Sequence, residues 1–258
     1  MKLDGHSMLA LIESGEIKAF KEIRDDFGQV SKQKLHIKDL NIGENSVNVT
    51  LGNHLLEKSK TNKTPFIFDD QGKKISYVDP FIQESVAYIP VKKTQITPED
   101  QGFILYPGKV YLGYAQERFE CSPLMLNEKL NPLTKSDIAL YHEDPTGNGV
   151  AKNIFKSRLV PMIEGRSTTG RLGFTNHITA GFGDVGFKGN FTLEIVNLDE
   201  TPILLRPGME IGQVFFDLAT EPLSKYDRGT AYDGAYSSNH NGKAVPPVLG
   251  RDRFFKKK

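Results

Sequence analysis

Two Pro-Gly pairs, each set between short apolar segments, constrain the fold of this 258-residue chain more than any other feature. A proline followed by a glycine suits a type II turn, because the residue after the proline needs a positive φ. The two pairs are Pro107-Gly108 and Pro207-Gly208. The segments beside them are Phe103–Leu105, Val110–Leu112, Ile203–Leu205 and Val214–Phe216. Short apolar segments spaced by such turns indicate an all-β barrel or sandwich, and not layers of alternating helices and strands.

Three further segments have a recognisable local pattern. Apolar residues recur at helical spacing within Ser7–Ser14 and Gly15 follows them, which predicts a short helix. Val47–Leu51 alternates apolar and polar residues, which predicts a half-buried strand. Phe66–Phe68 and Ile75–Val78 flank a group of turn-forming residues, so we expect a hairpin there.

These patterns predict a single domain over residues 1–258, a length that suits one large domain or two small ones. Residues 122–157 are polar and rich in turn formers, so we expect a surface insertion in that range. Small and polar residues dominate from about residue 229 onward. That composition predicts a C-terminal arm, ordered only by a substrate or by another subunit.

Charge and cysteine content narrow the classes of function. Lys and Arg total 33 against 32 Asp and Glu, a formal net charge of +1 that gives no reason to expect a nucleic-acid partner. No apolar stretch approaches the roughly 20 residues that cross a bilayer, so we expect no membrane partner. With Cys121 as the single cysteine, the chain forms no internal disulfide and no zinc site with several cysteine ligands. A reducing, cytoplasmic location is expected.

Two short motifs suggest chemistry that their surroundings do not support. Gly181–Gly186 matches GxGxxG, but a dinucleotide-binding fold needs a helix directly after it. Phe187–Leu193 shows glycine and two-residue alternation instead. His142-Glu143 resembles part of a zinc deaminase motif, which also needs a Pro-Cys-x-x-Cys segment that one cysteine cannot supply. Any deamination by this chain is therefore expected to proceed without catalytic zinc.

The segment Glu164–Gly173 has the composition of a phosphate-binding loop. It contains two arginines, two threonines, a serine and three glycines. Glycines allow close approach of the backbone, hydroxyl and N–H groups donate to phosphate oxygens, and arginines neutralise phosphate charge. A flexible surface loop can have the same composition, and it is the alternative interpretation.

The predicted strand Asn190–Ile195 carries one carboxylate on the face opposite its apolar residues. Phe191, Leu193 and Ile195 share one face of this strand. Glu194 projects from the other face. A solvated glutamate is the ordinary interpretation of such a position, and the functional one is a carboxylate that transfers protons for a bound water.

Together these segments resemble the dCTP deaminases, and most closely the branch that combines dCTP deaminase with dUTPase activity. The resemblance runs through Glu164–Gly173, His177–Phe182, Asp184–Glu194 and Arg206–Gln213, with weaker similarity in Ser46–Gly52 and Phe103–Gly113. It implies a dUTPase-like distorted jelly roll or β-barrel with a short N-terminal helix and a C-terminal arm. It also implies a homotrimer whose active sites are shared between subunits.

The resemblance assigns roles to residues at matching motif positions. Glu194 becomes the general acid/base for deamination, and Arg171 a catalytic residue near both the triphosphate and the reacting base. Asp184 matches an aspartate that, in dUTPases and bifunctional members, borders the deoxyribose and assists attack of water on phosphorus. Monofunctional dUTPases carry an apolar residue where Glu194 stands. The implied substrate-binding residues are Arg166, Ser167, Thr168, Thr179, Ala180, Phe182, Gln213 and Tyr232.

The implied ligands are dCTP and dUTP, with Mg²⁺ accompanying the triphosphate, no metal bound by side chains, and no zinc. The expected reaction is deamination of dCTP to dUTP, with hydrolysis of dUTP to dUMP and pyrophosphate as a second activity. Two alternatives remain open, a dUTP diphosphatase without deaminase activity and a non-catalytic nucleotide-binding regulator. Glu194, Arg171 and Ser167 favour an enzyme. The motif around Tyr232 lacks the lysine and glutamine of the family's C-terminal lid, which favours the regulator.

Overall fold

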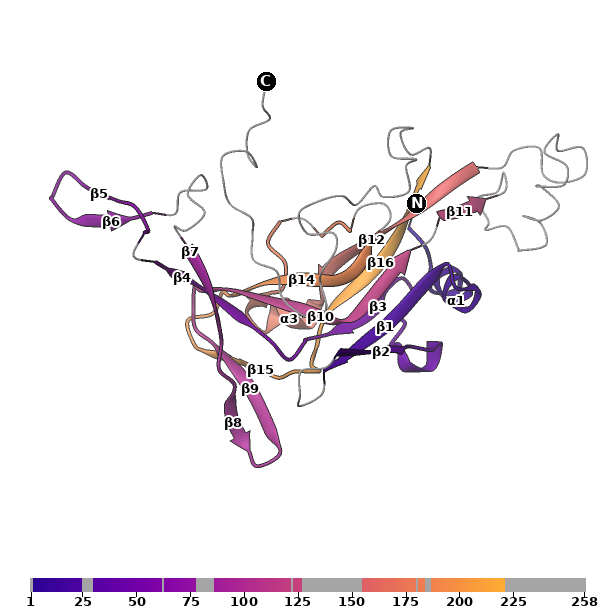
Figure 1. The fold of residues 1–258 in the computed structure, drawn as a ribbon, viewed down its shortest axis with the longest axis horizontal. Coiled ribbons are helices and arrows are strands. Elements are labelled where there is room, and N and C mark those ends of the chain that lie inside the picture. The colour runs from indigo at the N-terminus through magenta and orange to yellow at the C-terminus, as the bar shows by residue number, and fades with distance from the viewer. Residues whose placement is uncertain are drawn as a thin grey trace, which may run out of the picture.

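The computed structural model describes residues 2–24, 30–61, 63–77, 86–121, 123–126, 155–179, 181–183 and 187–220. Within these ranges the chain is mainly β, and its paired strands are antiparallel (Figure 1). The predicted fold class is therefore confirmed. The predicted C-terminal arm lies outside the described residues. No helix in the described ranges is long and apolar enough to cross a membrane.

The larger sheet is built around the 12-residue strand β10 (Val110–Cys121). Its remaining strands are β13 (Phe174–Thr175), β14 (Lys188–Asn197), β1 (Ile17–Arg24), β2 (Val30–Lys34), β4 (Leu56–Lys60) and β7 (Val86–Pro90). The strand β14 pairs with β10 on either side of a register shift between Tyr114 and Arg118. At this shift Asn190 Nδ2 donates to the carbonyl oxygens of Ala115 and Gln116, at 3.0 and 3.1 Å. These bonds satisfy backbone groups that the irregular ladder leaves unpaired.

A four-stranded sheet contributes the other side of the core. Its order is β11 (Pro123–Leu126), β12 (Phe155–Gly165), β16 (Glu210–Thr220) and β3 (Val47–Thr50). Phe119 of β10 meets Phe216 of β16 edge to face, with ring centroids 5.6 Å apart and both side chains buried. Burying one such ring contributes roughly 1.5–3 kcal/mol relative to leaving it exposed. The apolar faces of the two sheets therefore form one core.

The range 122–157, predicted as a surface insertion, begins and ends in strands. The pairing of β11 with β12 runs from Pro123 opposite Arg158 to Leu126 opposite Phe155. Proline is tolerated at the start of an edge strand, since its missing N–H faces away from the ladder. Four residues that open with proline carry no alternation, so the sequence pattern did not indicate this pairing. Residues 127–154 lie outside the described ranges.

Both Pro-Gly turns leave a small sheet and enter a large one. The small sheet contains β15 (Ile203–Leu205), β9 (Asp100–Leu105) and β8 (Thr94–Thr97). Gly108 and Gly208 have φ values of 67° and 81°, as the turn prediction requires. The first turn leads from β9 into β10 of the seven-stranded sheet, and the second leads from β15 into β16 of the four-stranded sheet. The paired turns thus join three sheets.

The predicted helix is α1 (Gly5–Ser14), and it begins two residues earlier than expected. Asp4 caps it, because its carboxylate accepts the N–H of Ser7 at 2.7 Å. Gly15 ends it in the left-handed conformation, with φ at 89°. A single 3₁₀ turn, η1 (Ile37–Asp39), lies between β2 and β3.

The predicted hairpin is also present, as β5 (Phe66–Phe68) and β6 (Lys74–Ser76). Asp69 Oδ1 accepts the N–H groups of Gln71 and Lys73 in its turn, at 3.0 and 2.8 Å. The hairpin projects from the body of the molecule, at the left of Figure 1. Its aromatic side chains are exposed, Phe68 to 63%.

Candidate active site

The arginine- and glycine-rich segment folds into the end of β12 and the short helix α3 (Ser167–Arg171). Arg166 and Thr169 exchange two hydrogen bonds that close the first turn. The Arg166 N–H donates to Thr169 Oγ1 at 3.1 Å, and the Thr169 hydroxyl donates to the Arg166 carbonyl at 2.6 Å. Ser167 and Thr168 remain exposed in this turn. Arg171 donates from one guanidinium nitrogen to Ser167 Oγ at 3.2 Å, so two of the predicted phosphate contacts lie side by side.

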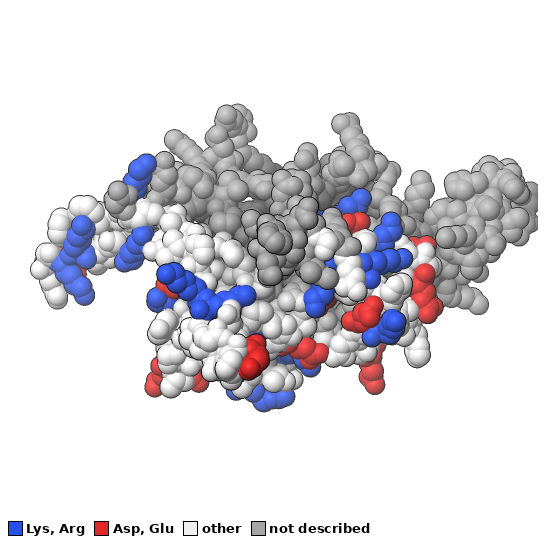
Figure 2. Space-filling view, turned by 60° about the horizontal axis from the view of Figure 1, so that its bottom comes forward, with Lys and Arg blue, Asp and Glu red and all other residues white. Residues whose placement is uncertain are grey.

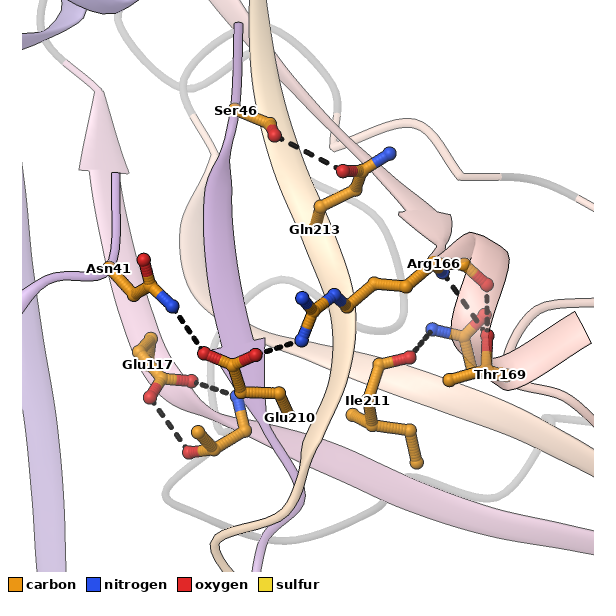
Figure 3. A network of polar contacts seen from close by, with 10 residues as sticks. Asn41, Ser46, Glu117, Arg166, Thr169, Glu210, Ile211 and Gln213 are labelled. Carbon is orange, nitrogen blue, oxygen red and sulfur yellow. Dashed lines mark hydrogen bonds and ion pairs between the residues drawn. The ribbon is translucent and has the colours of Figure 1, made fainter. Parts of the chain in front are cut away.

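Arg166 is held by a carboxylate that the sequence did not indicate. Glu210, the first residue of β16, forms an ion pair with the Arg166 guanidinium. The second oxygen of Glu210 accepts from Asn41 Nδ2, so this carboxylate bridges two segments far apart in the chain (Figure 3). The Arg166 and Glu210 side chains are both partly exposed, which leaves the guanidinium open to an anionic ligand.

Gln213 lies on the same strand as Glu210, three residues further along. In the ladder it is opposite Glu164, the residue two positions before Arg166. Its Oε1 accepts the hydroxyl of Ser46 at 3.1 Å (Figure 3). The segment 41–46 therefore braces both Gln213 and, through Glu210, Arg166. Asn41 and Ser46 reach these residues across more than 160 positions of sequence, which explains why local patterns did not identify Asn41.

Glu194 occupies β14 as the alternation predicted. Phe191, Leu193 and Ile195 are buried, and Glu194 on the opposite face is half-buried. Its Oε2 accepts the N–H of Ile178 at 3.1 Å. Oε1 of Glu194 has no hydrogen-bond partner in the described part of the chain. The carboxylate is thus held at one oxygen and open at the other.

The loop that follows β13 carries further predicted residues. Thr179 is exposed, and so is Phe182, to 62%. Phe182 forms an isolated bridge with Met162 of β12. Between the described residues Glu194 and Arg171 no hydrogen bond or ion pair is present. Ala180, Asp184 and Tyr232 lie outside the described residues.

The GxGxxG match does not open a helix. The strand β14 begins at Lys188, immediately after this segment and Phe187. A dinucleotide site of the Rossmann kind is therefore rejected, as the sequence predicted. Gly181 and Gly183 serve packing instead, since a Cβ on Gly181 would lie 2.4 Å from the Ile163 carbonyl oxygen.

A second glutamate, Glu117 on β10, is buried with 7% of its surface exposed. Its two oxygens accept the N–H and the hydroxyl of Thr50, at 2.7 and 2.8 Å. Burial raises the pKa of the Glu117 carboxyl above its ordinary value, although the Thr50 hydrogen bonds act in the opposite direction. Thr50 is opposite Glu210 in the pairing of β3 with β16, and Figure 3 shows Glu117 near Glu210. The sequence patterns did not single out Glu117.

Metal-binding side chains and the single cysteine also bear on the chemistry of the described residues. No group of three His, Cys, Asp or Glu side chains is placed there to hold a metal ion. Burial raises the pKa of the Cys121 thiol to about 12, so this side chain is a poor nucleophile. Acidic and basic side chains are interspersed on the described surface that faces the viewer in Figure 2.

The fold and the site define an antiparallel β protein with an arginine- and glycine-rich segment and a half-buried carboxylate. A family model described as dCTP deaminase-like matches residues 154–219. A "dCTP deaminase, dUMP-forming" of Halobacterium salinarum is 31% identical over 221 residues, or 83% of this chain and 89% of that protein. A protein with the same name from Clostridium acetobutylicum is 30% identical over 232 residues, or 89% and 93% of the two chains. The chain belongs to the dCTP deaminase family.

Proposed function

We propose that this protein deaminates dCTP and converts it to dUMP, releasing ammonia and pyrophosphate. The observation that carries the proposal is the place of Glu194, half-buried on β14 with Oε2 held by the Ile178 N–H and Oε1 open. Family relatives that match over most of their length are named dUMP-forming dCTP deaminases. Their names fit a site in which one carboxylate serves the base and a separate group serves the phosphates.

In deamination, Glu194 acts as the general base. It takes a proton from water while the water oxygen attacks C4 of cytosine, and it returns the proton to the amino nitrogen. The C4–N bond then breaks and ammonia leaves, while the remaining proton of the attacking water passes from the new C4 hydroxyl to N3, which gives the C4 carbonyl and the N3–H of uracil. The Ile178 N–H orients the carboxylate so that its open oxygen faces the water. Thr179, Phe182 and the backbone around Ala180 contact the base.

The segment from Arg166 to Arg171 holds the triphosphate. Arg166 and Arg171 supply charge-assisted hydrogen bonds, and Ser167, Thr168 and the Gln213 amide supply neutral ones. Mg²⁺ would accompany the triphosphate of the substrate and neutralise part of its charge. Deamination is expected to survive a zinc-selective chelator. Loss of the activity with that chelator, restored by zinc and not by Mg²⁺, contradicts this part of the proposal.

The second step is hydrolysis of dUTP at the α-phosphorus. Asp184 assists a second water in attacking phosphorus, the bond to the bridging oxygen of the β-phosphate breaks, and pyrophosphate leaves. Asp184 is proposed for this role from its motif position, and Tyr232 from the C-terminal lid is proposed to cover the nucleotide.

We propose a homotrimer whose neighbouring subunits complete each site. Leu172, Ile178 and Phe182 are exposed large apolar side chains close in sequence to the proposed nucleotide contacts. Exposed apolar groups around a polar site are typical of surfaces that another subunit covers. Light scattering at micromolar concentration should give the mass of three 28.8-kDa chains. A monomer at that concentration contradicts the shared site.

One incubation tests the proposed activity. The protein is mixed with dCTP and Mg²⁺, and dCTP, dUTP and dUMP are resolved by chromatography while ammonia is measured. We expect dUMP and ammonia to appear together. Accumulation of dUTP alone indicates a deaminase without the second step. Hydrolysis of supplied dUTP without loss of dCTP indicates a diphosphatase, and tight nucleotide binding without any product indicates a regulator.

A further inference from the structure

Asn176 joins the two large sheets at the loop that carries the proposed base contacts. Its side chain is 1% exposed. Its Nδ2 donates to the carbonyl oxygen of Ile211 in β16 at 2.8 Å. The main-chain carbonyl of Asn176 accepts the N–H of Glu194 in β14 at 3.0 Å. One residue therefore contacts both the four-stranded sheet and the strand of the proposed general base.

Two glycines make room for this side chain. Gly165 and Gly212 are opposite each other in the pairing of β12 with β16. A Cβ on Gly212 would lie 2.6 Å from Asn176 Nδ2, and a Cβ on Gly165 would lie 3.0 Å from its Oδ1. Real Cβ atoms do not approach a nitrogen as closely as 2.6 Å, so Gly212 is needed for Asn176 to sit where it does.

The loop transmits the position of Asn176 to the Glu194 carboxylate. Ile178, two residues after Asn176, donates its N–H to Glu194 Oε2 at 3.1 Å. The Asn176 main-chain carbonyl also accepts the backbone N–H of Glu194. The backbone and the carboxylate of Glu194 are therefore both bonded to the segment from Asn176 to Ile178. Because the Asn176 side chain is bonded to Ile211 in β16, we expect it to hold in place the Ile178 N–H that orients the Glu194 carboxylate.

We propose that Asn176 is a positioning residue for Glu194, acting through the Ile178 N–H. The inference rests on the proposed role of Glu194 in deamination. Asn176 itself needs no contact with the substrate. Its role is to hold one oxygen of the carboxylate so that the other stays directed at the attacking water, a geometry on which general-base catalysis depends.

Asn197 provides a control in β14, the strand that carries Glu194. It is also fully buried, and its Nδ2 donates to the carbonyl oxygens of Leu105 and Thr201, at 2.9 and 2.8 Å. Asn176→Leu and Asn197→Leu both keep the branched shape and remove the donor. Both variants should therefore melt at lower temperature, because each leaves a buried carbonyl unpaired. Asn197→Leu also removes the acceptor of the Asp199 N–H, so the comparison rests on kcat and on the Ile178 amide, which a merely structural role for Asn176 leaves alike in the two variants.

Steady-state kinetics with dCTP and Mg²⁺ separates the two roles. We expect kcat of Asn176→Leu to fall at least ~10-fold with KM within about threefold, a loss within the range of general acid–base catalysis. Asn197→Leu should keep kcat within about threefold of the parent, equivalent to under 1 kcal/mol of barrier. Equal kcat values for the two variants overturn the proposal, and so does a change confined to KM.

Hydrogen exchange at the Ile178 amide tests the positioning without reference to activity. Asn176→Leu should speed this exchange at least ~10-fold, and Asn197→Leu should leave it unchanged, since protection reports the local hydrogen bond. Unchanged Ile178 exchange in Asn176→Leu overturns the proposal. A parent protein that does not deaminate dCTP, but whose Ile178 exchange responds as predicted, overturns the proposed function and leaves the positioning intact.

A second variant covers the case in which Asn176→Leu does not fold. Gly212→Ala places a methyl group against Asn176 Nδ2 and should lower kcat in the same way. Gly102→Ala is its control, because a Cβ there would lie 2.7 Å from Leu204 Cδ1 and 2.8 Å from the Leu205 carbonyl, away from the site. Equal kcat values for these two glycine variants contradict the proposal.

Discussion

Two glutamates on neighbouring antiparallel strands have opposite surroundings. Glu117 of β10 is buried, has both oxygens bonded to Thr50, and has its pKa raised by burial. Glu194 of β14 is half-buried, bonded at Oε2 to the Ile178 N–H and open at Oε1. A shifted pKa in isolation points to Glu117 as the functional carboxylate, whereas geometry points to Glu194.

A raised carboxyl pKa reports burial and does not by itself identify a catalytic residue. A general base must reach a water molecule and the reacting atom within hydrogen-bond distance. Glu117 offers neither oxygen, since Thr50 occupies both. Perturbed carboxyl groups at functional sites are common, but structural polar contacts produce the same perturbation. Access therefore decides between these two residues.

Replacing the two proposed catalytic carboxylates, Glu194 and Asp184, should separate deamination from hydrolysis. Glu194→Gln keeps size and hydrogen bonding but cannot accept the proton, so deamination of dCTP should fall by about 10²- to 10⁴-fold. Nucleotide binding should survive, and supplied dUTP should still be hydrolysed. Asp184→Asn should show the reverse, with dUTP hydrolysis damaged more than deamination. Rates on dCTP and on dUTP, measured for both variants, check this division, and parallel losses on both substrates contradict it.

Arg171 is expected to act on binding more than on proton transfer. Arg171→Lys keeps the charge but loses the planar pair of donors, and charge-assisted hydrogen bonds of this kind contribute roughly 1.5–3 kcal/mol. KM for dCTP should rise about 10-fold or more. Arg206→Lys is the control, because Arg206 pairs with Asp100 at an exposed position. A similar KM for the two variants removes Arg171 from the phosphate site.

Glu117 should affect stability, and its effect should depend on pH. Glu117→Gln should change the free energy of unfolding by about 1 kcal/mol, as expected for one hydrogen-bonded contact. Because the folded pKa is raised, the stabilisation from protonated Glu117 is full below the ordinary glutamate pKa. It is lost as pH rises through the higher folded value. The variant should therefore gain on the parent in urea unfolding as pH increases, and a constant difference contradicts the raised pKa.

The buried thiol of Cys121 tests whether burial in the core around β10 also suppresses chemical reactivity. With its pKa raised to about 12, the thiol should not react with a thiol-specific reagent at neutral pH in the folded protein. It should react once urea unfolds the chain. Rapid labelling without unfolding indicates that the core around β10 opens locally.

Local sequence patterns carried much of the fold and part of the site. The helix ending at Gly15, the Gly108 and Gly208 turns, and the face of Glu194 each depend on a few consecutive residues, so period and turn chemistry predict them. The contacts of Asn176 with Ile211 and of Glu210 with Asn41 do not depend on consecutive residues. They join segments 35 and 169 residues apart. Such partners are set by how the sheets pack, which a local pattern does not record.

The most direct test measures initial rates of dCTP deamination for Glu194→Gln and Glu117→Gln in one assay, at matched concentrations of folded protein. The rate for Glu194→Gln should fall at least about 100-fold. The rate for Glu117→Gln should stay within about threefold of the parent, since its oxygens accept from Thr50 and do not serve the substrate. A Glu194→Gln protein that deaminates dCTP at the parent rate, or a Glu117→Gln protein that alone loses activity, would show that Glu194 is not the general base.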